Sequence, residues 1–224
     1  MDIAILTFEG FNEIDSFVAS HILNRVQIDG WKAAITCPSE TVQSTNGVRV
    51  AAQQPLEFAN DADVVLFGGS PLSREIVDDR AIMSRLKLNP SRQLIGSQCA
   101  GAWFLAKLGL LATLPVCTSR ATRPLLEAKG IRVLDQPFFA GGNIASAGGC
   151  LASPYLATWV ILRLLGRDAA ETALGSVAPV GQKAQYVAGA LDVVSPFVTA
   201  NAEGELTLAP KPRAAGNLSH GTKH

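Results

Sequence analysis

Short apolar runs alternate along this chain with longer segments in which apolar residues recur every three or four positions. The short runs predict strands buried on both faces, and the longer segments predict the helices that cover them. We expect strands at residues 2–8, 31–36, 63–67, 131–134 and 143–146, one that begins at residue 93, and a short one at 116–118. We expect helices at residues 14–26, 73–88, 124–129, 151–165 and 168–174, and one directly after residue 99. This order predicts an α/β fold with a doubly wound, mostly parallel sheet sandwiched by helices, as in flavodoxin-like proteins.

Three further features complete this outline. The dipeptide Asn46-Gly47 predicts a hairpin turn within residues 42–51. A chain of 224 residues with 48% hydrophobic residues is long enough for one substantial core, so we expect a single domain over residues 1–200. From residue 201 to residue 224 the composition turns to Ala, Pro, Gly, Lys and His without periodicity, which predicts a flexible tail.

Charge and cysteine usage narrow the class of protein. Nineteen basic residues balance nineteen acidic ones, so direct binding to nucleic acid or to an anionic membrane is not expected. The N-terminus does not read as a secretory signal, and no apolar run reaches membrane-spanning length. The four cysteines lie far apart and form no CxxC pair, which disfavours a zinc site and a disulfide scaffold. We expect a cytoplasmic protein with no metal and no cofactor.

The segment from residue 93 to residue 111 predicts a nucleophile elbow with sulfur in place of oxygen. An apolar strand runs into Cys99 and then at once into an apolar helix, and the small residues Ser97 and Gly101 flank the cysteine. A sharp turn from strand to helix requires such small neighbours. A cysteine at a helix N-terminus is expected to favour the thiolate. The alternative is that Cys99 is a small buried hydrophobic residue, as most free cysteines are.

Two other groups of residues are candidates for chemistry near Cys99. Gly68 and Gly69 end a predicted strand, where the N–H of Gly69 could join that of Ala100 in an oxyanion hole, unless the pair is only a turn. Glu13 and Asp15 lie in the first strand-to-helix connection, which opens on the same edge of a parallel sheet as the elbow. Asp15 could reach the cysteine, or could equally be an unpartnered charge at a helix N-terminus.

Histidines are scarce in this sequence, which bears on peptide hydrolysis. Outside the expected tail the chain contains only His21, which falls well inside the first predicted helix. A partly exposed helical histidine is the more natural interpretation of that position than a catalytic base. The sequence therefore disfavours a cysteine protease.

These residues together resemble the PfpI/ThiJ superfamily, whose members are similar to class I glutamine amidotransferases and are often dimers. The resemblance covers approximately residues 2–173. It rests on four matches, which are Asp15, the strand end at residues 67–69, the elbow at residues 97–101 with the Leu-Gly-Leu-Leu ending at 108–111, and the segment at residues 142–149. It implies a homodimer that acts on or binds a small molecule, with no cofactor.

Within this superfamily, Asp15 is similar to the aspartate of the isonitrile hydratase branch. That resemblance implies Cys99 as nucleophile on the isonitrile carbon, Asp15 as proton donor and acceptor, and a thioimidate that water releases as an N-substituted formamide. The hydratases tend to have threonine where this chain has Ala100, and the first helix lacks their usual Gly-Pro. The resemblance also makes Glu13, Gly68, Ser70, Gln98 and Ser119 candidates for contact with the substrate.

A second function is open beside the enzyme. Residues 179–187 are similar to the linker end of AraC-type regulators, whose N-terminal domain shares this fold, and we expect no helical period after residue 187. The protein would then be a ligand-binding or thiol-oxidation sensing module without its own DNA-binding domain, in which Cys99 is oxidised to sulfenate, or to sulfinate held by a protonated Asp15. A structural relative with an inert site would leave Cys99 buried.

Overall fold

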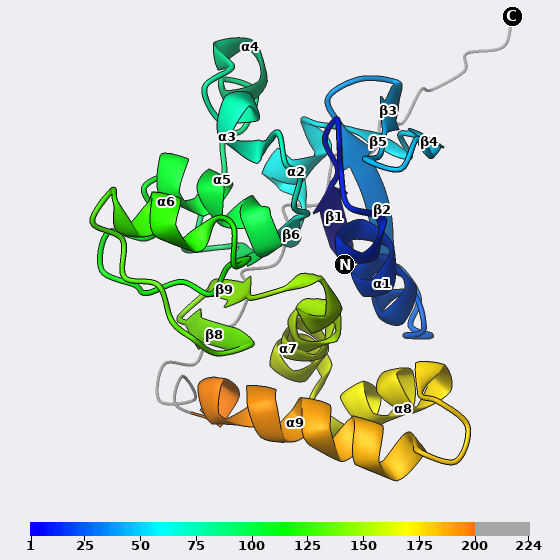
Figure 1. Cartoon of the computed structure of the whole chain (residues 1–224). Helices are drawn as coiled ribbons and strands as arrows, with labels where there is room; N and C mark the ends of the chain where they lie inside the picture. Colours follow the sequence, from blue (N-terminus) through cyan, green and yellow to red (C-terminus); the bar gives the residue numbers. More distant parts are fainter. Residues whose placement is uncertain (200–224) are drawn as a thin grey trace, which may run out of the picture.

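A seven-stranded sheet forms the centre of the computed structural model, which describes residues 1–199 (Figure 1). Its strand order is β5-β2-β1-β6-β7-β9-β8, and every pair is parallel except β8 with β9. The strands are β1 Asp2–Leu6, β2 Lys32–Cys37, β5 Gln54–Pro55, β6 Val64–Phe67, β7 Leu94–Gln98, β8 Phe138–Gly141 and β9 Ile144–Ala147. A separate antiparallel hairpin, β3 Thr41–Gln43 with β4 Arg49–Ala51, forms about the predicted turn. The sequence-based fold class is therefore confirmed.

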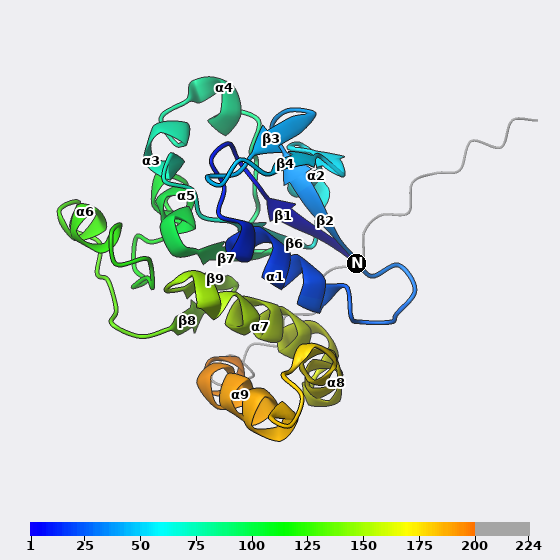
Figure 2. The ribbon, with the colours of Figure 1, turned by 45° about the vertical axis from the view of Figure 1, so that its right-hand side comes forward.

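Helices cover both faces of this sheet and form two cores (Figure 2). One face carries α1 Glu13–Leu23 and α7 Ser153–Leu165, with α8 Arg167–Val177 and α9 Lys183–Thr199 packed against α7. The other face carries α2 Phe58–Asp61, α3 Ser73–Ile76, α4 Arg80–Met83, α5 Ala102–Lys107 and α6 Arg123–Glu127. Successive residues of a strand point to opposite faces, so Ile3 joins the first core and Ala4 joins the second.

An aromatic stack holds α5 against the sheet. The ring of Phe104 stacks on that of Phe8 at 4.5 Å and on that of Phe67 at 4.8 Å between centroids. Gly101 allows this close approach, because a Cβ at that position would collide with the backbone carbonyl of Phe67. Since α5 begins three residues after Cys99, this packing also determines where the cysteine lies.

Three of the expected elements differ in the structure. The helix expected at residues 73–88 is two short helices, α3 and α4, because the side chain of Asp79 caps α4 by accepting from the N–H groups of Ala81 and Ile82. The strands expected at 116–118 and 131–134 reduce to one bridge between Val116 and Val133.

The C-terminal part of the described chain was predicted wrongly. We expected no helical period after residue 187, but α9 continues to Thr199. Its buried residues Ala190, Leu191 and Val194 belong to the core that α7 and α8 share, so tertiary packing stabilises a helix that the local pattern did not announce. β8 was also missed. The expected tail at 201–224 lies outside the described residues.

No helix within residues 1–199 has the length and hydropathy needed to cross a bilayer.

Candidate active site

Cys99 occupies a strained turn at the carboxyl edge of the sheet. It follows β7 directly and begins a single 3-10 turn, Cys99–Gly101, that leads into α5. Its φ of 50° makes it the only non-glycine residue with positive φ among residues 1–199. The hydroxyl of Thr118 donates to the backbone carbonyl of Cys99 at 2.7 Å and helps to hold this conformation. The turn has the geometry of the predicted nucleophile elbow.

A cavity of about 430 Å³ opens beside Cys99. It is lined by Asn12, Asp15, Gly69, Ser70, Pro71, Arg74, Glu75, Cys99, Ala100, Trp103, Ser119, Ala121, Thr122, Leu125 and Cys150. These residues follow β1, β6, β7 and β9, whose carboxyl ends meet at one edge of the parallel sheet, where ligands bind in open α/β folds. Cys99 is only 5% exposed, which is the burial expected of an inert relative, but its side chain forms part of this cavity wall.

Asp15 brings a buried carboxylate to the same place. It is 3% exposed, and its Oδ2 accepts a hydrogen bond of 3.1 Å from the backbone N–H of Gly69. Burial raises the pKa of Asp15 from 3.8 to about 6, while the nearby thiols of Cys150 and Cys99 and the Gly69 N–H oppose that rise. Neither thiol makes a hydrogen bond of good geometry to Oδ1, so this buried oxygen has no partner among the described residues. A group that titrates near neutrality is suited to proton transfer.

The ionisation of Cys99 is opposite to what its place before a helix predicts. Burial raises the pKa of the Cys99 thiol far above its usual range, and the negative charge of Asp15 raises it further. The helix that follows has only six residues and starts after the 3-10 turn, so its dipole is weak at the sulfur. The expectation of a resting thiolate is therefore wrong, and Cys99 is a thiol until a base takes its proton.

A second cysteine lies in the site, although sequence reasoning gave it no role. The Sγ of Cys150 lies 3.5 Å from the Sγ of Cys99, and the Nδ2 of Asn12 donates to it at 3.1 Å. The signal was present, because Cys150 directly follows Gly148-Gly149 at the end of a predicted strand, as Cys99 follows another. The ligand atoms of Asp15, Cys99 and Cys150 lie within 4.8 Å of one another, so this cluster supplies the donors a thiophilic metal would use, once the thiols ionise.

The remaining predicted residues divide into two groups. Ser70 and Ser119 line the cavity, and Ala100 lies beside Gly69, whose N–H is engaged by Asp15. Glu13 and Gly68 do not line it. The carboxylate of Glu13 instead accepts from the hydroxyl of Ser44 at 2.5 Å and from Asn46 at 3.0 Å.

Gln98, the last residue of β7, contacts the turn that carries Cys150. Its Nε2 donates to the carbonyl oxygens of Gly149 at 2.5 Å and of Cys150 at 3.1 Å. Gln98 therefore positions the turn that carries the second cysteine. His21 lies on the exposed side of α1, within hydrogen-bonding distance of Arg25, and does not line the cavity.

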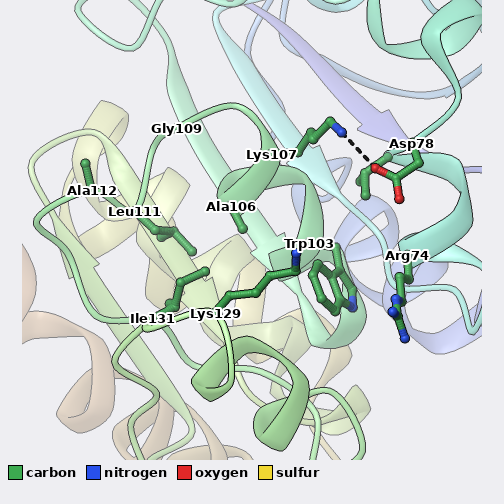
Figure 3. A pocket seen from close by; sticks show the side chains of 11 residues that line it. Arg74, Asp78, Trp103, Ala106, Lys107, Gly109, Leu111, Ala112, Lys129 and Ile131 are labelled. Atoms are coloured by element: carbon green, nitrogen blue, oxygen red, sulfur yellow. Dashed lines mark hydrogen bonds and ion pairs between the residues drawn. The ribbon is translucent and has the colours of Figure 1, made fainter.

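A second hollow of about 480 Å³ adjoins the site, and Arg74 and Trp103 line both. Figure 3 shows Lys107 paired with Asp78, at 2.7 Å between Nζ and Oδ1, and Lys129 reaching toward the ring of Trp103. The Nζ of Lys129 lies 5.7 Å from the centroid of that ring, within the range of a cation–π contact. Trp103 thus separates a basic surface hollow from the cysteine site.

The mostly parallel sheet, the elbow cysteine and the acid beside it define a class of proteins with the flavodoxin-like DJ-1/PfpI fold. The profile of the DJ-1/PfpI family matches residues 1–162, and the chain belongs to that family. None of the curated proteins matches the sequence.

Solved structures share this fold. DJ-1 from Schizosaccharomyces pombe has a TM-score of 0.67 and 18% identity over 80% of this chain and 100% of its own. An AraC family transcriptional regulator from Pseudomonas putida has a TM-score of 0.65 and 19% identity over 79% of this chain and 99% of its own. A cysteine-to-alanine mutant of a DJ-1 superfamily protein from Salmonella typhimurium has a TM-score of 0.64 and 25% identity over 75% of this chain and 92% of its own.

Proposed function

We propose that this protein is a cysteine-dependent enzyme that adds water to a small electrophilic carbon, with isonitriles as the first substrates to test. The observation that carries this proposal is that Cys99, on a strained elbow with φ 50°, shares one cavity with Asp15, whose pKa is raised to about 6. A thiol and a carboxylate that titrates near neutrality form a nucleophile and base pair.

The reaction follows from the protonation states of these two groups. At neutral pH Asp15 is mostly ionised and Cys99 is a thiol. Asp15 accepts the thiol proton while the sulfur attacks the isonitrile carbon, and it then delivers that proton to the same carbon to give a thioimidate. A water molecule adds to this carbon as Asp15 accepts a proton from it. Asp15 passes that proton to the substrate nitrogen. The carbonyl then forms as the C–S bond breaks, the remaining hydroxyl proton goes to the sulfur, and the Cys99 thiol and an N-substituted formamide are released.

The cavity favours a small substrate over a peptide. Its volume is about 430 Å³, and the side chains of Trp103 and Leu125 form part of its wall. Arg74 and Glu75 bring opposite charges to it, so it does not select strongly for an ion of one sign. Within residues 1–199 no histidine lines the cavity to protonate a leaving amine. Charge that develops on the substrate would meet the N–H of Ala100, since Gly69 already donates to Asp15.

The test compares the wild type with three variants on an alkyl and an aryl isonitrile, with formamide measured by mass spectrometry. Cys99→Ser and Asp15→Asn should lose the activity, while Cys37→Ala, which changes a buried cysteine in β2 away from the cavity, should keep it. A small 2-oxoaldehyde, scored by loss of the aldehyde, tests the broader class of electrophiles. If the wild type yields no formamide, isonitrile hydration is ruled out. If it also leaves the aldehyde unchanged, the enzyme proposal fails.

The second candidate is a ligand-binding or thiol-oxidation sensing module. Its support is the similarity to the structure of an AraC family regulator together with the sulfur-rich cavity. Mild peroxide should then modify the cavity cysteines and spare the buried Cys37 and Cys117. Equal oxidation of Cys37 would contradict a sensing site.

The proposed setting is a cytoplasmic homodimer with a small-molecule substrate and no direct contact with nucleic acid or membrane. Family resemblance and the balanced charge support this proposal. Light scattering coupled to size-exclusion chromatography measures the oligomeric state, and a monomeric mass at micromolar concentration would overturn the dimer. Fractionation of the producing cells tests the location.

A further inference from the structure

Two thiols from distant parts of the chain meet in the cavity because their strands are neighbours. Cys99 follows β7 and Cys150 follows β9, which run parallel with Gln98 opposite Ala147. Their Sγ atoms lie 3.5 Å apart. The side-chain amide of Gln98 donates to the carbonyl oxygens of Gly149 and Cys150, so the second turn is tied to the strand that carries the first thiol. The two sulfurs therefore lie close together because β7 and β9 are neighbours and Gln98 holds the turn that follows β9.

Hydrogen-bond donors converge on the sulfur of Cys150. Asn12 caps α1, with its Oδ1 accepting from the N–H of Ile14 at 3.0 Å, and this contact determines which way its amide faces. Its Nδ2 must therefore point toward Cys150, whose Sγ it reaches at 3.1 Å. The S–H of Cys99 is placed to donate to the same sulfur. Both contacts favour negative charge on Cys150 relative to Cys99.

The difference in exposure also makes Cys150 the more accessible of the two thiols. Cys99 is buried, whereas Cys150 is partly exposed and starts a short 3-10 turn, Cys150–Ala152, after Gly149 with φ 91°. The next residue, Leu151, is 81% exposed, so this turn lies at the surface. Burial and the charge of Asp15 raise the pKa of both thiols, but the hydrogen bond from Cys99 opposes that rise at Cys150. A small oxidant therefore meets Cys150 first.

We propose that a peroxide links Cys99 and Cys150 in a reversible disulfide, with Cys150 as the thiol that reacts first. Its sulfur attacks one peroxide oxygen, the O–O bond breaks, and sulfenic acid and water form. The Cys99 thiol then attacks the sulfenic sulfur, gives its proton to Asp15, and displaces hydroxide, which leaves as a second water after taking that proton. Two thiols and one hydrogen peroxide thus become one disulfide and two waters.

The bond requires a modest movement. A disulfide places its sulfurs about 2 Å apart, so the turn at Cys150 must approach Cys99 by roughly 1.5 Å. The result masks the nucleophile and also protects it from further oxidation to sulfinate, and a dithiol restores both thiols. This inference goes beyond the proposed enzyme and does not depend on the substrate.

The test treats the reduced protein with one equivalent of hydrogen peroxide and then denatures it in the presence of an alkylating agent. The wild type should lose two alkylatable thiols and two hydrogens in mass, and its digest should contain the peptide of Cys99 linked to that of Cys150. Cys150→Ser should form no link and should instead gain oxygen at Cys99. Cys37→Ala is the matched control and should form the same link as the wild type. Circular dichroism confirms that each variant is folded.

Two results would overturn the inference. One is an oxidised wild type in which oxygen has been added to Cys99 while Cys150 remains alkylatable. The other is slower oxidation of Cys150 in Cys99→Ser than of Cys99 in Cys150→Ser, which would reverse the proposed order. A disulfide without formamide production would leave this inference standing and would remove only the isonitrile hydratase.

Discussion

The hydroxyl of Thr118 donates a hydrogen bond of 2.7 Å to the backbone carbonyl of Cys99. The donor follows the bridge at Val116 and lies far along the chain from the elbow, yet it holds the one non-glycine residue with positive φ in the described chain. A strained backbone persists only where its surroundings determine it. Thr118 is therefore one of the contacts that keep Cys99 in place.

Replacing this hydroxyl tests how the elbow is held. Thr118→Val should lower the free energy of unfolding by about 1 kcal/mol and should slow alkylation of Cys99 severalfold, because the thiol loses its position. Thr158→Val is the matched control, since the Thr158 hydroxyl donates at 2.7 Å to the carbonyl of Pro154 within α7. Urea unfolding should show a similar loss for both variants. Equal alkylation rates in the two would argue against a role for Thr118 at the elbow.

The buried charge of Asp15 should make stability depend on pH. Its pKa is 3.8 when unperturbed and about 6 in the folded protein, so the folded state binds the extra proton between these values. The stability that the folded protein gains from protonated Asp15 is fully present below pH 3.8 and is lost as the pH rises through about 6. Asp15→Asn removes the buried charge and should be more stable than the wild type at pH 8 by about 3 kcal/mol.

The same comparison at low pH supplies the control. Near pH 4 both side chains are neutral, so urea unfolding should give nearly equal stabilities for the wild type and Asp15→Asn. A constant difference between the two proteins from pH 4 to pH 8 would mean that burial does not shift the pKa of Asp15.

The proposed mechanism predicts an acid limb in the pH profile of activity. Because ionised Asp15 accepts the Cys99 proton, kcat/KM should fall about tenfold for each pH unit below the pKa of about 6. Asp15→Glu keeps a base but moves the carboxylate, so it should retain a shifted limb at a lower maximum. An activity that is flat from pH 5 to pH 8 would exclude Asp15 as the base.

Gly69 should tolerate no side chain, for a reason specific to the site. A Cβ there would collide with the Oδ2 of Asp15 and lie 2.9 Å from the Cβ of Cys99. Gly69→Ala should therefore lower stability by about 1–3 kcal/mol and abolish activity. Gly189→Ala is the contrasting control, because Gly189 lies within α9 and a Cβ there meets nothing within 4 Å. It should raise stability by about 0.5–1 kcal/mol with unchanged activity, and thermal unfolding distinguishes the two.

Local pattern was sufficient for most of the fold and for the position of Cys99 on the elbow. The apolar run of β6 and the small residues around Cys99 are recognisable without a structure. A strand buried on both faces requires consecutive apolar residues, and a sharp turn requires small ones. β8 and α9 were missed because β9 and α7 stabilise them by packing, which a short window of sequence does not record.

What the sequence determined by itself was the order of most elements, the mostly parallel sheet and the position of Cys99 at its edge. Only the tertiary structure decided the chemistry of that edge. It placed Cys150 3.5 Å from Cys99, and it buried Asp15 deeply enough to raise its pKa to about 6. The physical reason is that hydrophobic periodicity depends on residues close together in the sequence. The ionisation of a side chain depends instead on desolvation and on charges that distant segments bring together.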